Sequence, residues 1–211
     1  LQINNPVLSS RDLMKIEGLH MPGLQAKKVS LLYYKNSSLA LALDRLFVAC
    51  DKAYYAGANI LILSDRGVDE NHIAIPSLLA VSAVQQYLVR TKKRTAISII
   101  LESAEPRDVH HFATLFGYGA SAVNPYLAQD CIGELIAGGA LNKDYYAAVD
   151  AYNKAILDGV MRIASKMGIS SMQSYEGAQI FEAVGICKDV VDRYFTTVSY
   201  THLTLPTSDL V

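Results

Sequence analysis

Short, almost continuous hydrophobic runs alternate along the chain with segments whose hydrophobic residues recur at helical spacing. This pattern predicts parallel strands joined by helices. Short β-branched or aliphatic runs, typical of strands, occupy residues 28–33, 59–63, 96–101 and 121–123. The second and third runs are almost continuously apolar, as is typical of strands covered on both faces. The sequence therefore predicts an α/β fold with a mostly parallel sheet sandwiched by helices.

Amphipathic patterns fill the intervals between these runs. Apolar residues recur at helical spacing over residues 39–55, and Ser37 or Ser38 can cap the start of this helix. Pro76 suits the first turn of a second helix, which continues to residue 88. A third helix is expected over 106–116. Each helix would cross over from one strand to the next.

After residue 127 the pattern is almost entirely helical. One helix runs through Leu135 and Ile136, and a long one begins near Asn142 and ends before Gly168, a suitable stop residue. Two shorter helices are predicted at the C-terminal end, over residues 176–184 and 188–195. We therefore expect a single domain whose C-terminal part is helical.

Composition and charge exclude several classes of protein. The 211 residues are 51% hydrophobic and 18% charged, which suits a folded domain and not a disordered chain. The net charge is -1 and the longest basic run is Lys92-Lys93-Arg94, so no nucleic-acid partner is expected. No apolar stretch reaches the roughly 18 residues of a membrane span, and the N-terminus lacks a signal-peptide pattern. We expect a cytoplasmic or mature organellar protein without a membrane partner.

Cysteine usage points away from disulfides and metal centres. Cys50, Cys131 and Cys187 are widely separated and odd in number, and none lies in a Cys-x-x-Cys pair. This spacing argues against a disulfide framework, a zinc site and an iron-sulfur site. All three are expected to be buried free thiols.

Two polar clusters directly follow predicted strands. Ser64-Asp65-Arg66-Gly67 lies where open α/β sheets bind ligands. Asp65 could accept hydrogen bonds from Arg66 or from backbone amides of the following turn, and Arg66 could hold a carboxylate or a phosphate. Asn124-Pro125-Tyr126 fits a strand-to-helix junction. Locally closed turns explain both clusters, while a free-standing binding module with its ligand near Asp65, Arg66 and Asn124 is the alternative.

His110 and His111 raise the question of acid-base or metal chemistry. They follow the third strand, close to Glu102, Glu105 and Asp108. Adjacent residues on a helix point about 100° apart and do not easily face one metal ion. A packing or capping role is therefore expected, and a small independent enzyme with one of these histidines as its base is a further alternative.

Two further motifs fit structural roles. Residues 117–122, Gly-Tyr-Gly-Ala-Ser-Ala, match a relaxed dinucleotide pattern but follow a helix and lead into a strand, the reverse of the required order. A helix-ending turn is expected there. Ser170-Ser171 and Gln173-Ser174-Tyr175 would suit a loop against another domain or a cofactor phosphate, although an ordinary loop accounts for them. No catalytic, cofactor-binding or metal-binding residue is predicted.

A set of ordered stretches nevertheless resembles one family. They occupy residues 62–67, 75–81, 109–112, 117–120, 122–127, 165–170 and 177–185. Among them, Ser-Lys-Met-Gly-Ile-Ser at 165–170 and Gly-Ala-Gln-Ile-Phe-Glu-Ala-Val-Gly at 177–185 have the closest likeness. From about Asn5 to Phe195, their order and spacing resemble the central domain of the glutamate synthase large subunit.

The resemblance implies a large multidomain flavoenzyme that makes two glutamates from glutamine and 2-oxoglutarate, using FMN and an iron-sulfur cluster. An N-terminal amidotransferase domain would release ammonia with a cysteine nucleophile, and a later barrel domain would hold the flavin and the cluster. The central domain would link these two partners and help shape the ammonia route. No residue here matches the nucleophile or the cluster cysteines, so an inactive fragment without its own cofactor is expected. Ferredoxin and a reduced nicotinamide both stay open as electron donor.

The chain departs from the family pattern in three places. Gln85-Gln86-Tyr87 stands where histidines are common, and Ala104 and Pro106 alter the loop after the third strand; we expect these changes to be tolerated. Residues 198–208 resemble translated sequencing-adapter sequence. The central domain is therefore expected over residues 1–195, followed at 196–211 by a non-native tail that is disordered or weakly packed.

Overall fold

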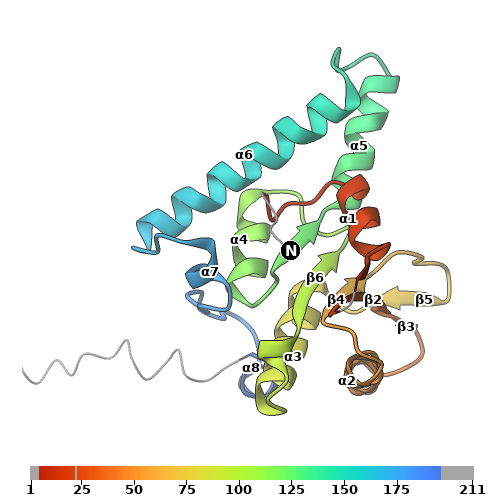
Figure 1. Ribbon diagram of the computed structural model, residues 1–211, viewed down its shortest axis with the longest axis vertical. Helices are drawn as coiled ribbons and strands as arrows, with labels where there is room; N and C mark the ends of the chain where they lie inside the picture. Colours follow the sequence, from red (N-terminus) through yellow and green to blue (C-terminus); the bar gives the residue numbers. More distant parts are fainter. Residues whose placement is uncertain (1–4, 22, 196–211) are drawn as a thin grey trace, which may run out of the picture.

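A five-stranded sheet forms the centre of the protein (Figure 1). The computed structural model describes residues 5–21 and 23–195, so the predicted tail lies outside the described residues. The order across the sheet is β1-β2-β4-β6-β7, with β1 antiparallel to β2 and all other pairs parallel. The strands are β1 (His20–Met21), β2 (Leu24–Ser30), β4 (Ile60–Ser64), β6 (Ser98–Glu102) and β7 (Ala122–Asn124). The predicted α/β fold with a mostly parallel sheet is confirmed.

Three crossover helices cover one face of this sheet. They are α2 (Leu39–Tyr55), α3 (Ser77–Arg90) and α4 (Val109–Gly117). The parallel strands follow one another across the sheet in chain order, and right-handed crossovers then place every connecting helix on the same face. Leu61, Leu63 and Leu101 point to that face and share one core with the three helices. All three helices occur where the sequence predicted them.

The opposite face carries α1 (Ser10–Glu17), a helix that the sequence analysis did not predict. Leu13 and Ile16 of α1 pack against Ile62 and Ile100 of the sheet. The sheet does lie between helices, as expected, but the two faces are covered very unequally.

The segment before α1 closes one edge of the sheet. Val7 forms a parallel bridge with Val123 of β7, and Leu8 N donates a hydrogen bond to Val123 O at 2.8 Å. Val123 N in turn donates to Pro6 O at 2.8 Å. Residues 6–8 therefore satisfy the backbone groups that β7 would otherwise leave open.

The strand predicted over residues 28–33 is wrong in its extent, because the run is divided between two sheets. β2 ends at Ser30, and β3 (Leu32–Tyr34) pairs antiparallel with β5 (His72–Ala74) in a separate two-stranded sheet. Leu31 between them is fully buried, donates its N–H to Ser64 O and accepts a hydrogen bond from Ile75 N. The apolar run continues through this bend, so hydropathy alone does not show where one strand ends.

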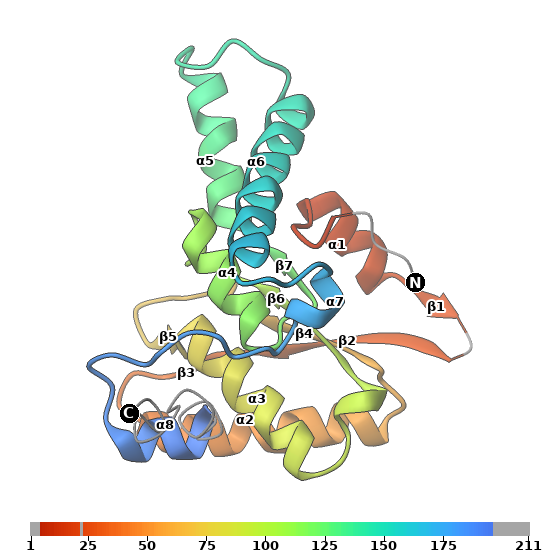
Figure 2. The ribbon, with the colours of Figure 1, turned by 90° about the vertical axis from the view of Figure 1, so that its left-hand side faces the viewer.

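The C-terminal part is helical, as predicted. α5 (Tyr126–Ala137) and α6 (Tyr145–Lys166) form a hairpin that projects from the body (Figure 2). Gly168, with a φ of 73°, follows the end of α6. Two short helices complete the described chain: α7 (Met172–Tyr175) and α8 (Lys188–Tyr194).

The helix predicted over residues 176–184 does not form. Gly177 and Gln179 have positive φ angles of 73° and 55°, which a right-handed helix does not allow. Gly177 N donates to Phe116 O at 3.0 Å and Gln179 N to Gly117 O at 2.9 Å. Two N–H groups of the segment thus bind carbonyls at the C-terminal end of α4, where the last carbonyls of a helix have no partner within it.

The expectation of three buried cysteines is also wrong. Cys50 is buried in α2, and burial followed by the nearby charge of Asp51 raises the pKa of its thiol to about 12. Cys131 in α5 and Cys187 before α8 are exposed. Gln129 is the buried residue of α5, so that helix leaves most of its surface, including Cys131, open to solvent.

Helix α6 crosses α4 at a glycine, and this contact gives a first testable prediction. A Cβ at Gly159 would lie 2.7 Å from Cγ1 and 3.2 Å from Cβ of Val109. Gly159→Ala is therefore expected to lower the free energy of unfolding by about 1–3 kcal/mol in urea denaturation, despite the higher helix propensity of alanine. Adding Val109→Ala should recover part of this loss, because it removes the methyl groups that clash.

Gly133→Ala in α5 is the matched control. Its new Cβ would meet Tyr145 Cε2 at 3.5 Å, an ordinary contact distance. We expect this variant to be neutral or stabilised by about 0.5–1 kcal/mol. Equal losses at Gly133 and Gly159 would contradict the close crossing of α4 and α6.

Candidate functional site

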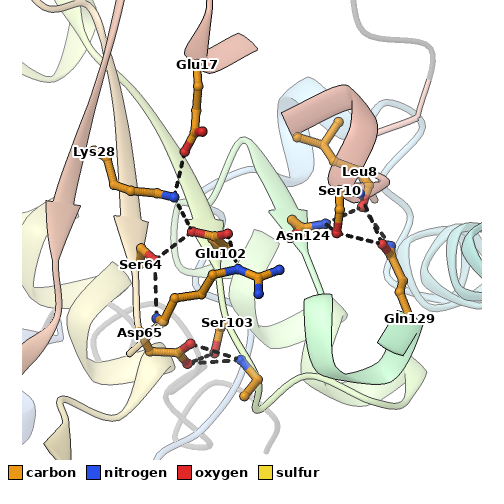
Figure 3. Close-up of polar contacts among 12 residues, drawn as sticks. Leu8, Ser10, Glu17, Lys28, Ser64, Asp65, Glu102, Ser103, Asn124 and Gln129 are labelled. Atoms are coloured by element: carbon orange, nitrogen blue, oxygen red, sulfur yellow. Dashed lines mark hydrogen bonds and ion pairs between the residues drawn. The ribbon is translucent and has the colours of Figure 1, made fainter. Parts of the chain in front are cut away.

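A polar network around a buried carboxylate joins the carboxyl ends of the central strands (Figure 3). Its centre is Glu102, the last residue of β6, whose side chain is 4% exposed. Glu102 Oε2 accepts a hydrogen bond from Ser64 Oγ at 2.6 Å and lies 2.8 Å from Lys28 Nζ. Glu102 Oε1 lies 2.6 Å from Arg66 Nε. The parallel register pairs Ser64 with Glu102, so the fold itself brings these side chains together.

The charges in this network stabilise one another. Burial acts to raise the pKa of Glu102, but hydrogen bonds from Lys28, Ser64 and Arg66 outweigh it and hold that pKa below its usual value. Burial also opposes the charge of Lys28, whose hydrogen bonds to Glu102 and Glu17 nevertheless raise its pKa. Glu17 belongs to α1 and lies 2.7 Å from Lys28 Nζ. The network therefore ties β2, β4 and β6 to α1 through ion pairs.

This network predicts sensitivity to acid. A carboxylate whose pKa is lowered by folding contributes stability above its ordinary value of 4.5, and loses that contribution as the pH falls through the lowered value. We expect Glu102→Gln to lower the free energy of unfolding by about 1–3 kcal/mol at neutral pH. The difference between the two proteins should shrink below pH 4.5. Urea denaturation over a pH series measures this, and a difference that stays constant into acid would contradict it.

Asp65 binds the loop that follows β6. Its carboxylate accepts hydrogen bonds from Ser103 Oγ at 2.6 Å and from Ala104 N at 3.0 Å. Burial, followed by the charge of Asp65 and a hydrogen bond to it, raises the pKa of Tyr126 to about 12. The guanidinium carbon of Arg66 lies 3.9 Å from the centre of the Tyr126 ring. The partners expected from the sequence, Arg66 or the following turn, are thus replaced by groups from the loop after β6 and from the first residue of α5.

Asn124 faces the N-terminal segment. Its Nδ2 donates to Leu8 O at 3.0 Å, and Gln129 Nε2 donates to the same carbonyl at 2.9 Å. Gln129 Oε1 accepts a hydrogen bond from Ser10 N at 3.1 Å. Among the described residues, no hydrogen-bond partner reaches the buried Oδ1 of Asn124. The sequence-predicted set is thus divided, with Asp65 and Arg66 beside the Glu102 network and Asn124 in a separate group that holds the segment before α1.

Three members of these networks were not predicted from the sequence: Lys28, Ser103 and Gln129. The available signal for Lys28 was a charged residue at the start of an apolar run, whereas no feature of the sequence marks the Gln129 amide as buried. In both networks most polar groups bind one another, and the carboxylates of Asp65 and Glu102 accept bonds from several donors each. Such an arrangement holds the strand ends together.

The two histidines take structural positions. Asp108 caps α4, and its Oδ1 accepts hydrogen bonds from the backbone N–H groups of His110 and His111. His111 Nδ1 accepts a hydrogen bond from Arg107 N at 3.1 Å. The His110 ring packs edge-on against Phe181, with 5.5 Å between the ring centroids. In the described part of the chain, no three His, Cys, Asp or Glu side chains gather as metal ligands would.

The two remaining motifs lie at the end of α4. The Gly117 to Ala122 stretch is a helix-ending turn, as predicted, with Gly119 at a φ of 113°. The loop expected around residues 170–175 instead contains α7, capped by Ser171. Tyr175 is fully buried, and its hydroxyl donates to Ala113 O at 3.1 Å. The polar stretch therefore anchors the C-terminal segment onto α4.

The residues present do not fit the two cofactors that the family resemblance implies. Cysteine ligands of an iron-sulfur cluster must converge on one point, whereas Cys50, Cys131 and Cys187 lie on separate elements and only Cys50 is buried. A flavin phosphate at the carboxyl edge of the sheet would meet the buried carboxylates of Asp65 and Glu102. The two cations beside these carboxylates, Lys28 and Arg66, are already paired with Glu102.

Comparison with known proteins gives one consistent family. The family model of the glutamate synthase central domain matches residues 1–187. The chain is 47% identical over 196 residues to the NADPH glutamate synthase large chain of Bacillus subtilis, covering 93% of this chain and 13% of that one. It is 34% identical over 202 residues to the NADH glutamate synthase of Schizosaccharomyces pombe, covering 92% and 10%. It is 38% identical over 211 residues to ferredoxin-dependent glutamate synthase 2 of Synechocystis, covering 92% and 13%.

Proposed function

Because this chain belongs to the glutamate synthase central domain family, we propose that it is the central segment of a glutamate synthase large chain and that its role there is structural. The chain spans only 13% of the Bacillus subtilis relative, so the parent protein is much longer. The observation that carries the structural role is the carboxyl edge of the sheet, where Asp65, Arg66 and Glu102 are held in bonds to other groups of the chain. Such bonds stabilise the fold and leave the chemistry to other segments.

We infer that the parent enzyme converts glutamine and 2-oxoglutarate into two glutamates, as part of ammonia assimilation and glutamate biosynthesis. FMN and the iron-sulfur cluster of that oxidoreductase would lie in other segments, because the cysteines and carboxylates here suit neither. Relatives named for NADPH, NADH and ferredoxin all match, which leaves the electron donor open. We assign the parent to the cytoplasm or to an organelle. In the described ranges, no helix is both long and apolar enough to cross a membrane.

The proposed partners are the amidotransferase and FMN-binding domains of the same polypeptide. Support comes from apolar surface on the projecting hairpin of α5 and α6. Leu127 is 42% exposed and Leu135 is 51% exposed, and Cys131 between them is also exposed. Successive members of this set are four positions apart, so the three side chains form one stripe along α5. Exposed apolar stripes are typical of surfaces that another domain covers.

The proposal is tested with the purified 211-residue chain. After incubation with FMN and removal of the excess, we expect no flavin absorbance, and no glutamate from glutamine and 2-oxoglutarate with an artificial reductant. The complete Bacillus subtilis large chain, treated in the same way, is the positive control. Flavin retained by this chain near one equivalent, or glutamate formation, would overturn the proposed structural role.

The alternatives have weaker support. A free-standing binding module near Asp65, Arg66 and Asn124 would need these groups to converge on a ligand, whereas Asn124 binds Leu8 O instead. The contacts of the two histidines do not support an independent enzyme that uses one of them as its base. His110 packs against Phe181, and His111 accepts a hydrogen bond from the backbone of Arg107. The domain boundary at Phe195 stays a prediction.

A further inference from the structure

β2 is the open edge of the parallel sheet (Figure 1). On its inner side, residues 26–30 pair with β4. On its outer side, β1 covers only Leu24 and Gln25. Beyond these two positions, no strand of the described chain pairs with the outer backbone groups of β2. An open edge of this kind presents a row of N–H and C=O groups to any extended segment that approaches it.

A hollow of about 560 Å³ runs along this edge, between β2, α2 and the small sheet of β3 and β5. Its α2 wall is largely apolar and includes Leu46, Ala49 and Ala53. A second hollow continues along α2 past Val48, which is 55% exposed. The edge of β2 and these hollows together form one groove, called the β2–α2 groove below.

Three cations line the groove without a counter-ion. Lys27, Arg45 and Lys52 are exposed, and none of them forms an ion pair with another described residue. The nearby carboxylate on α2, Asp44, is 3.5 Å from Arg193. The chain as a whole has a net charge of -1, so this positive excess is local.

We propose that the β2–α2 groove binds an extended, acidic peptide segment of a protein partner, which adds to β2 as a further strand. Backbone hydrogen bonds to the open edge would hold the segment, and alternate side chains would enter the apolar groove. Its Asp or Glu side chains would lie near Lys27, Arg45 and Lys52. The inference rests on contacts of this chain alone, so its failure would leave the proposed function untouched.

Two simpler roles for this surface account for fewer of its features. Lysine on an edge strand guards against aggregation, but that role does not require Arg45 and Lys52 on a helix. A second copy pairing edge to edge would bring Lys27 and Lys28 of the two copies close together, and like charges on neighbouring strands are destabilising. An acidic segment matches both the open edge and the unpaired cations.

The test uses a fluorescein-labelled peptide of about nine residues, long enough to span the edge, in which every second residue is threonine and the positions between them alternate glutamate with valine, so that glutamate and valine share the face toward the groove. Fluorescence anisotropy with the 211-residue chain should give a Kd of about 10–100 μM. A peptide with lysine in place of each glutamate should bind at least about tenfold more weakly. N-methylation of alternate peptide nitrogens, which removes the main-chain donors of one edge, should abolish binding.

Two charge-reversed variants locate the site. Arg45→Glu with Lys52→Glu should weaken binding about tenfold or more, because both cations line the groove. Lys154→Glu with Lys166→Glu, at exposed positions of α6, makes the same change in net charge and should have little effect. All four positions are exposed on helices, and circular dichroism checks that both variants fold.

Several results would overturn the proposal. They are equal binding of the acidic and basic peptides, equal loss in the two charge-reversed variants, and unchanged binding of the N-methylated peptide. Displacement of the acidic peptide by a single-stranded oligonucleotide at lower concentration, or a dimer in analytical ultracentrifugation that Arg45→Glu with Lys52→Glu disrupts, would assign the groove to another occupant.

Discussion

Gly119→Ala is expected to lower the free energy of unfolding by about 3–5 kcal/mol, through backbone strain and overpacking combined. Gly119 has a φ of 113°, where a residue with a Cβ is strained. Its new Cβ would also lie 2.6 Å from Cδ and 2.8 Å from Cγ of Gln85. Gln85 is buried, so its side chain has little room to move.

The effect should extend beyond the turn, because Gln85 belongs to a connected set of polar groups. Gln85 Oε1 accepts a hydrogen bond from Arg94 Nε, and Arg94 Nη2 pairs with Glu176 Oε1 at 2.5 Å. Glu176 Oε1 also accepts a hydrogen bond from Ser121 Oγ at 2.7 Å. Displacing Gln85 would thus disturb contacts between α3, the turn before β7 and the C-terminal segment.

Urea denaturation followed by circular dichroism measures this prediction. Gly168→Ala is the matched control, because Gly168 has a φ of 73° but no atom lies within 4 Å of the methyl group that alanine would add. It should cost only the backbone strain, about 1 kcal/mol. Gln85→Ala in the Gly119→Ala background should recover part of the loss. Equal costs at Gly119 and Gly168 would refute the steric part of the argument.

Tyr175→Ala is expected to cost about 3–5 kcal/mol, because it removes a fully buried aromatic side chain and leaves a cavity against α4. The hydroxyl donates to Ala113 O at 3.1 Å, and burial raises the pKa of Tyr175 to about 12, so the donor proton stays in place at neutral pH. Tyr175→Phe removes only the hydroxyl and should cost about 0.5–1.5 kcal/mol.

Tyr175→Ala should also release the segment that follows α7. The N–H groups of Gly177 and Gln179 donate to carbonyls of α4, and hydrogen exchange reports on both. We expect their exchange to accelerate in Tyr175→Ala and less so in Tyr175→Phe. Tyr146→Ala, at a position that is 60% exposed, is the control and should change stability by no more than about 0.5 kcal/mol. A Tyr175→Ala protein as stable as this control would contradict the anchoring role.

Part of the candidate site was predictable from residue order alone. Asp65 and Arg66 directly follow a strand, and strands of a parallel sheet end at a common edge, so their position there follows from the sequence. The partners within the network do not follow from the sequence. Ser64 and Glu102 are 38 positions apart, and only the register of β4 against β6 makes them neighbours.

The sequence by itself determined the helices whose signals are local. α2 has the predicted bounds of Leu39–Tyr55, because Ser38 caps its first turn and its apolar residues recur at helical spacing. The end of α6 before Gly168 and the turn at Gly119 were predicted for the same reason. Capping, periodicity and glycine conformation act between residues a few positions apart, so tertiary contacts left them unchanged.

Tertiary structure alone decided which sheet each part of an apolar run joins and which partners the backbone N–H and C=O groups bind. The run at 28–33 is divided because Leu31 bonds both Ser64 and Ile75, which the fold places on its two sides. The segment 176–184 has a helical pattern, but the N–H groups of Gly177 and Gln179 bind carbonyls at the end of α4. Hydropathy indicates that a side chain is buried, but it does not identify the residues that pack against it. A buried backbone N–H needs a hydrogen-bond acceptor, and the packing of neighbouring elements decides which carbonyl lies within reach.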